Sequence, residues 1–282
     1  MTYQKNVLIP DLPFEAYSKV DALNASLIKK IHKSPAHAKA YLDKLETEDE
    51  DSEALLFGSA FHAALLEPQR FKEFLKVSPK ADRRTTAGKA IAAEFEASLI
   101  EGDIVVKESW LEQITGMLLS IKNHPLANPL LTNGVRENCL FWDDPETGVP
   151  CKARFDFISH EGIPIDIKTA RDAQPDRASR EIFSDDRLYW LQAGHYVSGA
   201  KVTNVCCHDS FTFIFIEKTP PYALSVKIME GPDLDASMDH RNRLVRKYKK
   251  SMESGIWESY PPEPTIATVG DWFMQKYSKD AI

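Results

Sequence analysis

The segment Arg154-Phe-Asp-Phe-Ile-Ser-His-Glu-Gly-Ile-Pro-Ile-Asp-Ile-Lys168 decides the fold. Two runs rich in β-forming residues flank His160-Glu-Gly162, and the glycine suits the left-handed position that a three-residue hairpin loop requires. Counting back from this loop places Asp156 directly opposite Asp166. The segment therefore predicts an antiparallel hairpin that brings two carboxylates to adjacent positions.

Strand alternation adds a lysine to this pair. Residues two apart on a strand share a face, so Lys168 lies on the side of Asp166, with Arg154 opposite it. The other face is expected to carry the apolar side chains Phe155, Phe157, Ile165 and Ile167. Two carboxylates about 5 Å apart repel each other, and such oxygen ligands suit Mg²⁺ or Mn²⁺. A nearby lysine can orient a water or stabilise charge on a phosphate.

The hairpin pattern thus predicts a metal-dependent phosphodiester hydrolysis site. A solvent-facing strand with ordinary salt bridges also fits this spacing. Paired carboxylates occur in retaining glycosidases as well, but the adjacent lysine and the lack of an evident aromatic sugar groove disfavour that reading.

Composition restricts the class of protein. Hydrophobic residues make up 43% of the 282 residues. This share suffices for a hydrophobic core and excludes a wholly disordered chain. The net charge of -7 excludes a uniformly basic surface but allows a local basic groove. No apolar run approaches the roughly 18 residues of a membrane helix, and the N-terminus does not resemble a signal peptide. We expect a cytoplasmic protein without a membrane partner.

The order of elements predicts one α/β domain over residues 1–282, in which 20–125 are mostly helical and 134–230 carry the sheet and the active site. Periodicity predicts helices over about 34–42, 53–67, 88–100, 108–123, 186–199 and 234–251. Strands are expected at 135–142, 149–159 and 163–169, followed by a hairpin formed by 211–217 and 222–229.

The carboxylate–lysine pattern resembles the core motif of the PD-(D/E)xK nuclease superfamily. Further segments resemble the phage and prophage RecE-type exonucleases (exodeoxyribonuclease VIII family): Leu27–Tyr41 with Ser34-Pro-Ala-His37, Phe57–Pro68, Asp82–Thr85 with Gly88-Lys89, Gln192-x₃-Tyr196 and Phe215–Tyr222. The resemblance implies a restriction-endonuclease-like core, in which helices flank a central mixed sheet, with a helical N-terminal portion.

The resemblance also implies a set of metal ligands: His62, Asp156, Asp166 and the main-chain carbonyl of Ile167. The expected ion is Mg²⁺, with Mn²⁺ as a substitute. From the residues alone, a lone histidine such as His62 is more often a satisfied core residue. Glu137 matches an acidic position of many relatives; it either binds a second metal through water or is an exposed strand residue.

Lys168 matches the catalytic lysine of the family. Gln192 and Tyr196, one helical turn apart, match residues near the scissile phosphate. The alternative is that Tyr196 packs on the sheet and Gln192 caps a neighbouring group.

Three basic residues resemble a family segment near the DNA: Arg83, Arg84 and Lys89. Phosphate contacts there would be salt-dependent and blind to base sequence. A mobile surface loop is the alternative. The basic residues between 241 and 250 favour a solvated helix face over a DNA contact.

Two cofactors are not expected. The four cysteines, Cys139, Cys151, Cys206 and Cys207, lack the spacing of the iron–sulfur cluster that some related nucleases carry. No GxxxxGK motif is present, so no nucleotide cofactor is expected.

The resemblance implies a Mg²⁺-dependent exonuclease that degrades double-stranded DNA ends 5′-to-3′ and leaves 3′ single strands for recombination by annealing. It also implies a ring-shaped homotetramer, a RecT-like single-strand annealing partner, and a phage or prophage gene expressed in the cytoplasm of a bacterial host. An endonuclease of the same fold and a non-catalytic DNA-binding recombination accessory protein are the alternatives.

Overall fold

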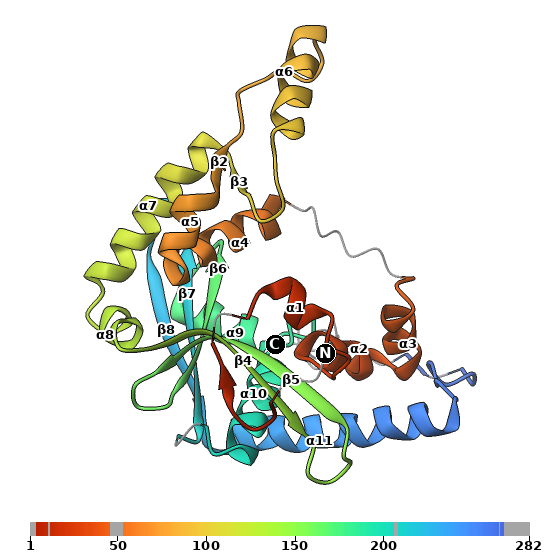
Figure 1. Cartoon of the computed structure of the whole chain (residues 1–282). Coiled ribbons are helices and arrows are strands. Elements are labelled where there is room, and N and C mark those ends of the chain that lie inside the picture. Colours follow the sequence, from red (N-terminus) through yellow and green to blue (C-terminus); the bar gives the residue numbers. More distant parts are fainter. Residues whose placement is uncertain (1–3, 11, 46–52, 206–207, 265, 268–282) are drawn as a thin grey trace, which may run out of the picture.

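A six-stranded mixed sheet lies at the centre of the molecule, with helices on both faces (Figure 1). The computed structural model describes residues 4–10, 12–45, 53–205, 208–264 and 266–267. The strand order is β1-β4-β5-β6-β7-β8, and only β6 and β7 are parallel among these neighbours. The strands are β1 (Leu8–Ile9), β4 (Gly134–Asp143), β5 (Pro150–Ser159), β6 (Pro164–Ala170), β7 (Ser210–Glu217) and β8 (Leu224–Glu230). The predicted fold class is confirmed.

Two helical layers bury the two faces of the sheet. One layer contains α2 (Ala25–Lys33), α3 (Pro35–Leu42), α10 (Tyr189–Val202) and α11 (Gly231–Ser254). The other contains α4 (Glu53–Leu66), α7 (Glu108–Asn123) and α8 (Ala127–Thr132). A third apolar cluster joins α9 (Pro175–Ile182) to β7 and β8. The short helices α1 (Phe14–Ser18) and α5 (Pro68–Phe74) complete the body.

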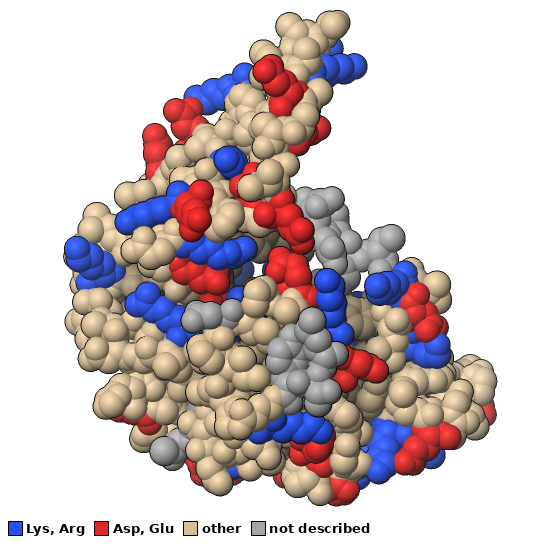
Figure 2. Space-filling view, viewed as in Figure 1, with Lys and Arg blue, Asp and Glu red and all other residues tan. Residues whose placement is uncertain are grey.

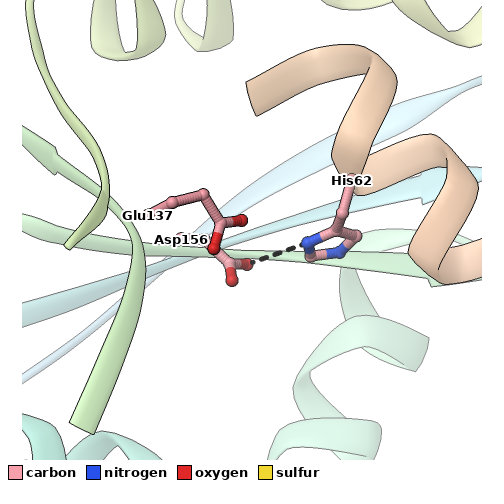
Figure 3. Close-up of side chains that lie close together, drawn as sticks. All are labelled: His62, Glu137 and Asp156. Atoms are coloured by element: carbon pink, nitrogen blue, oxygen red, sulfur yellow. Dashed lines mark ion pairs between the residues drawn. The ribbon is translucent and has the colours of Figure 1, made fainter. Parts of the chain in front are cut away.

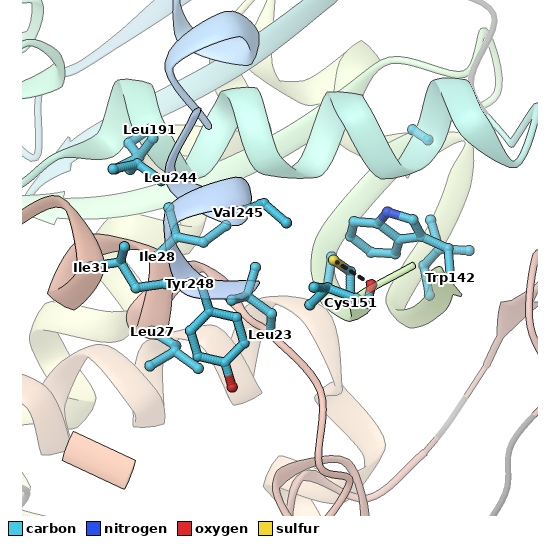
Figure 4. Packing of buried hydrophobic residues seen from close by; sticks show 14 of the residues in the cluster. Leu23, Leu27, Ile28, Ile31, Trp142, Cys151, Leu191, Leu244, Val245 and Tyr248 are labelled. Atoms are coloured by element: carbon cyan, nitrogen blue, oxygen red, sulfur yellow. Dashed lines mark hydrogen bonds between the residues drawn. The ribbon is translucent and has the colours of Figure 1, made fainter. Parts of the chain in front are cut away.

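The first core layer holds α10 against the sheet (Figure 4). Leu191 of α10 and Val245 of α11 are fully buried among side chains of α2. Two glycines let α10 approach closely: a Cβ on Gly194 would lie 2.2 Å from Oγ of Ser237, and a Cβ on Gly199 2.6 Å from the ring of Trp142. This tight packing fixes the position of α10, which carries Gln192 and Tyr196.

Several elements were predicted correctly from local signals. Ser34 caps α3 through its side chain, with Pro35 at the first helical position. The predicted helix over 108–123 and the hairpin of β7 and β8 are confirmed. The helix expected over 88–100 is present as α6 (Thr86–Ala97). It lies between two strands that were not predicted, because β2 (Leu75–Val77) pairs in parallel with β3 (Ile104–Val106). No local pattern indicates a pairing between such distant three-residue strands.

The decisive hairpin has the predicted register but a shorter ladder. Phe157 pairs with Ile165, and Ile158 with Pro164. At Asp156 the ladder is replaced by a side-chain bond, because the N–H of Ile167 donates to Oδ2 of Asp156 at 2.9 Å. The strands therefore separate around the first carboxylate.

This separation corrects two predictions about side-chain direction. Phe155 lies in the core layer of α10, whereas Phe157 lies in the opposite layer, so the two do not share a face. Arg154 does not face Lys168; its guanidinium lies 2.7 Å from the carboxylate of Glu137. The distortion coincides with the positive φ of 50° at Glu137 on the neighbouring strand, which breaks regular alternation there.

A buried polar network connects α11 to the β4–β5 connection. Arg241 is 1% exposed; it forms an ion pair with Asp144 and donates to Sγ of Cys151 at 3.2 Å. His195 is fully buried, with Nε2 3.0 Å from the carbonyl oxygen of Lys152 and Nδ1 3.4 Å from Nε of Arg241. These contacts require a neutral imidazole that donates through Nε2 and accepts at Nδ1. Burial, and then the charge of Arg241, lower the pKa of His195 to about 3.

We expect this histidine to make stability fall as the pH falls. The unfolded chain binds a proton at His195 below about pH 6.5 and the folded chain does not, so each further pH unit costs up to about 1.4 kcal/mol. The stabilisation that His195 provides is fully present above about pH 6.5. It is lost as the pH falls toward the pKa of His195 in the folded chain, about 3. Urea unfolding at several pH values measures this slope. His195→Gln keeps both hydrogen-bonding roles without titrating and should reduce the slope; equal slopes in both proteins would contradict the assignment.

Candidate active site

Three side chains from three elements meet beside the strand separation (Figure 3). They are His62 of α4, Glu137 of β4 and Asp156 of β5, and one potential ligand atom of each lies within 4.8 Å of the others. Nδ1 of His62 is 3.6 Å from Oδ2 of Asp156, and Nε2 is 2.9 Å from the carbonyl oxygen of Ile167. His62 is therefore part of a polar cluster and not an isolated core histidine.

The second carboxylate lies on the side of α10, together with the lysine. Nζ of Lys168 is 2.7 Å from Oδ2 of Asp166, which is 4% exposed. Gln192 donates from Nε2 to Oδ1 of Asp166 at 2.7 Å, and its Oε1 is 3.5 Å from Nζ of Lys168. Gln192 thus contacts both groups and does not cap a neighbouring element.

Asp156 connects these two groups of residues. One of its oxygens lies beside His62 and also accepts the N–H of Ile167, the residue that follows Asp166. Burial raises the pKa of Asp156, the charge of His62 lowers it, and the charge of Asp166 raises it further. For Lys168, burial alone would lower the pKa, but the carboxylates of Asp166 and Asp156 raise it above its usual value. The lysine is therefore held as a charged ammonium.

Glu137 is not the exposed strand residue that one interpretation expected. Its side chain is 13% exposed and ion-paired with Arg154. Burial, followed by the charge of Asp156, raises its pKa to about 8. Arg154, whose side chain also lies 3.9 Å from Glu67, was not identified as a site residue from the sequence. The sequence signal that could have indicated Arg154 is its position two residues before Asp156 on the same strand.

The donor set fits a divalent cation. It offers carboxylate oxygens, the carbonyl of Ile167 and one imidazole, a combination that suits Mg²⁺ or Mn²⁺. The raised pKa values of Asp156 and Glu137 show that buried negative charge here is under-compensated by the protein. A cation at this position would stabilise the ionised carboxylates.

Tyr196 lies near enough to the polar cluster that, beyond burial, the charges of Asp166 and Asp156 add to the rise in its pKa. Its ring packs 5.0 Å from that of Phe155 and 6.0 Å from that of Phe211, between α10 and the sheet. Burial raises its pKa well above the usual value. Its ring contacts hold α10 against the sheet, and its place near the scissile phosphate stays a prediction.

The predicted DNA-contacting residues lie on a projecting arm formed by β2, α6 and β3 (Figure 1). Arg83 pairs with Glu96 at 2.7 Å, and Arg84 with Asp82 at 3.0 Å. Lys89 is exposed on α6. Figure 2 shows acidic and basic side chains interspersed along this arm and over the body below it. The structure does not bring the arm residues to the carboxylate cluster.

Two other sequence expectations concern cysteines and membrane segments. Cys139 and Cys151 are buried free thiols, and Cys206 and Cys207 lie outside the described residues. In the part of the chain that the structure describes, no helix is both long and apolar enough to cross a membrane.

A mixed sheet that carries two carboxylates and a lysine at this strand separation defines the PD-(D/E)xK class of fold. Residues 24–261 match the model of the PDDEXK-like domain of unknown function (DUF3799), and the chain belongs to that family. The predicted superfamily is thereby confirmed. No curated protein sequence matches the chain.

A solved structure shares this fold. A suspected exonuclease from Eubacterium rectale superposes with a TM-score of 0.57 over 95% of this chain and 99% of its own, at 12% identity. A phage-related exonuclease from Haemophilus somnus 129PT matches 63% of this chain and 90% of its own, at 15% identity and a TM-score of 0.32. The family and the fold support a nuclease.

Proposed function

We propose that this protein is a Mg²⁺-dependent exonuclease that hydrolyses double-stranded DNA from its ends, in the 5′-to-3′ direction. The observation that carries the proposal is the cluster of His62 and Asp156 beside the ion pair of Asp166 with Lys168. Membership of a PDDEXK-like family and the fold shared with a suspected exonuclease support hydrolysis of nucleic acid. The exonuclease mode and the polarity rest on the resemblance to RecE-type enzymes.

The proposed mechanism assigns a task to each group. His62, Asp156, Asp166 and the carbonyl of Ile167 would hold the cation, with Glu137 within reach of a second one. A bound divalent cation polarises a phosphate and makes water more acidic.

Lys168 acts on the reacting groups directly. Its ammonium donates hydrogen bonds to the attacking water or to the phosphate oxygens, whose negative charge increases in the transition state. Gln192 contacts both Lys168 and Asp166, so it restricts the lysine to one position. In this scheme Tyr196, one helical turn after Gln192 on α10, packs against the sheet and lies near the scissile phosphate.

The partners belong to the same proposal. The enzyme would leave 3′ single strands for a RecT-like annealing protein in the cytoplasm of a bacterial host. A ring-shaped tetramer would let a chain with a net charge of -7 hold DNA, because only the inner wall of the ring needs to be basic. Arg83, Arg84 and Lys89 would contact DNA phosphates from the projecting arm.

Linear and covalently closed circular duplexes distinguish the candidate functions. With Mg²⁺ we expect the linear duplex to release nucleotides and become single-stranded, the closed circle to stay intact, and EDTA to stop nucleotide release. Digestion of closed circles would favour an endonuclease. Metal-independent DNA binding without nucleotide release would favour a recombination accessory protein.

A further inference from the structure

A second lysine contacts the same tyrosine ring as Lys168. Nζ of Lys29 is 5.3 Å from the ring centre of Tyr189, and Nζ of Lys168 is 4.7 Å from the same centre. Lys168 is ion-paired with Asp166. Lys29 forms neither an ion pair nor a hydrogen bond through its ammonium with any residue that the structure describes.

The position of Lys29 is fixed by the packing of α2. The side chain of Asn24 caps this helix by accepting the N–H of Leu27. Ile28 and Ile31 are fully buried in the core layer shared with α10 and α11. Because the backbone of α2 is held on both sides of Lys29, the ammonium is directed toward Tyr189 at the start of α10.

This arrangement is unfavourable for the protein alone. Burial, followed by the positive charge of Lys168, lowers the pKa of Lys29 to about 8, and Asp166 compensates only in part. The guanidinium of Arg187 adds a third positive charge nearby, although Arg187 lies 3.4 Å from a carboxylate oxygen of Glu181. A partly buried ammonium gains most from an anionic partner. The ring of Tyr189 provides a cation–π contact but no counter-charge.

We propose that Lys29 and Tyr189 form a subsite that binds a backbone phosphate adjacent to the scissile one. The inference rests on the proposed function, in which Lys168 acts at the scissile phosphate. Both ammonium groups contact one ring, so the two phosphates of a single nucleotide step can reach them together. Such a contact positions the strand and does not take part in bond cleavage, so it lowers KM more than it changes kcat.

The test maps phosphates one at a time. Linear duplexes carry a single neutral methylphosphonate at successive positions near the 5′ end, and their binding is measured in EDTA. We expect Lys29→Met to weaken binding of unmodified DNA about tenfold, and to reduce the slope of log K against log salt by about one. At one position beside the scissile phosphate, the methylphosphonate should weaken binding by the wild type but not by Lys29→Met.

Two variants control for charge and for folding. Lys29→Arg should retain most of the affinity, and Lys250→Met, which removes an exposed lysine from the far end of α11, should bind like the wild type. Since Lys29→Met removes an uncompensated charge, its thermal midpoint should not fall.

Several results would overturn the subsite. One is that Lys29→Met binds DNA as tightly as the wild type. Another is that each methylphosphonate weakens binding equally, whatever its position. A third is a lower thermal midpoint of Lys29→Met without weaker DNA binding, which would make Lys29 a structural residue. A kcat defect at unchanged KM would place Lys29 in the chemical step instead. If the wild type neither binds nor degrades DNA, the proposed function itself is wrong.

Discussion

Replacing Lys168 by methionine will slow DNA hydrolysis by about 100- to 1000-fold, while DNA binding in EDTA changes little. The ammonium lies 2.7 Å from Asp166, and the two carboxylates keep it charged. Methionine has a similar length but donates no hydrogen bond, so charge on the phosphate would be uncompensated in the transition state only. Single-turnover cleavage of a linear duplex measures this rate without a contribution from product release.

The control for this variant addresses folding. Lys168→Met leaves the carboxylate of Asp166 buried without its counter-ion, which destabilises the fold. The double variant Lys168→Met, Asp166→Asn removes that charge and should recover stability without recovering activity. A Lys168→Met protein that cleaves DNA at the wild-type rate would contradict the role assigned to Lys168.

Replacing Arg241 by methionine will lower the free energy of unfolding by about 3–5 kcal/mol, because the carboxylate of Asp144 remains buried without its partner. Arg241 also contacts His195 and Cys151, so the variant leaves two further buried groups without a donor. Thr147 still donates to Asp144, which keeps the loss within this range. Urea unfolding measures the change.

The same helix offers a matched control. Arg246 forms an ion pair with Glu146 that links the same two elements, but both side chains are about half exposed. Solvent screens such pairs, so Arg246→Met should leave stability nearly unchanged. If Arg241→Met and Arg246→Met lost equal free energies of unfolding, burial of the Arg241–Asp144 pair would not explain its contribution to stability.

Local sequence signals predicted the parts of the site that depend on short-range geometry. The loop glycine Gly162 determined the register, and the register placed Asp156 beside the segment of Asp166 and Lys168. The direction of Phe155 was predicted wrongly, because the β5–β6 ladder ends next to Asp156 and regular alternation does not continue there. The positive φ of Glu137 occurs at the same point on the neighbouring strand. Such a distortion arises from tertiary contacts that a strand pattern does not contain.

Other site residues required information from outside their own segments. His62 lies on a helix far from the hairpin in sequence, and only the resemblance to RecE-type enzymes indicated its role. The partners of Arg154 and Lys29 come from different elements, so neither could be identified by spacing. The arm that holds α6 was missed for the same reason, because β2 and β3 pair across it.

The central claim is that the carboxylates around Lys168 support metal-dependent hydrolysis of DNA. It is tested most directly by nucleotide release from end-labelled linear duplex, comparing the wild type with Asp166→Ala in Mg²⁺ and in EDTA. We predict release by the wild type in Mg²⁺ alone, and none by Asp166→Ala although its circular dichroism spectrum stays native. An active Asp166→Ala protein, or release by the wild type in EDTA, would contradict the account.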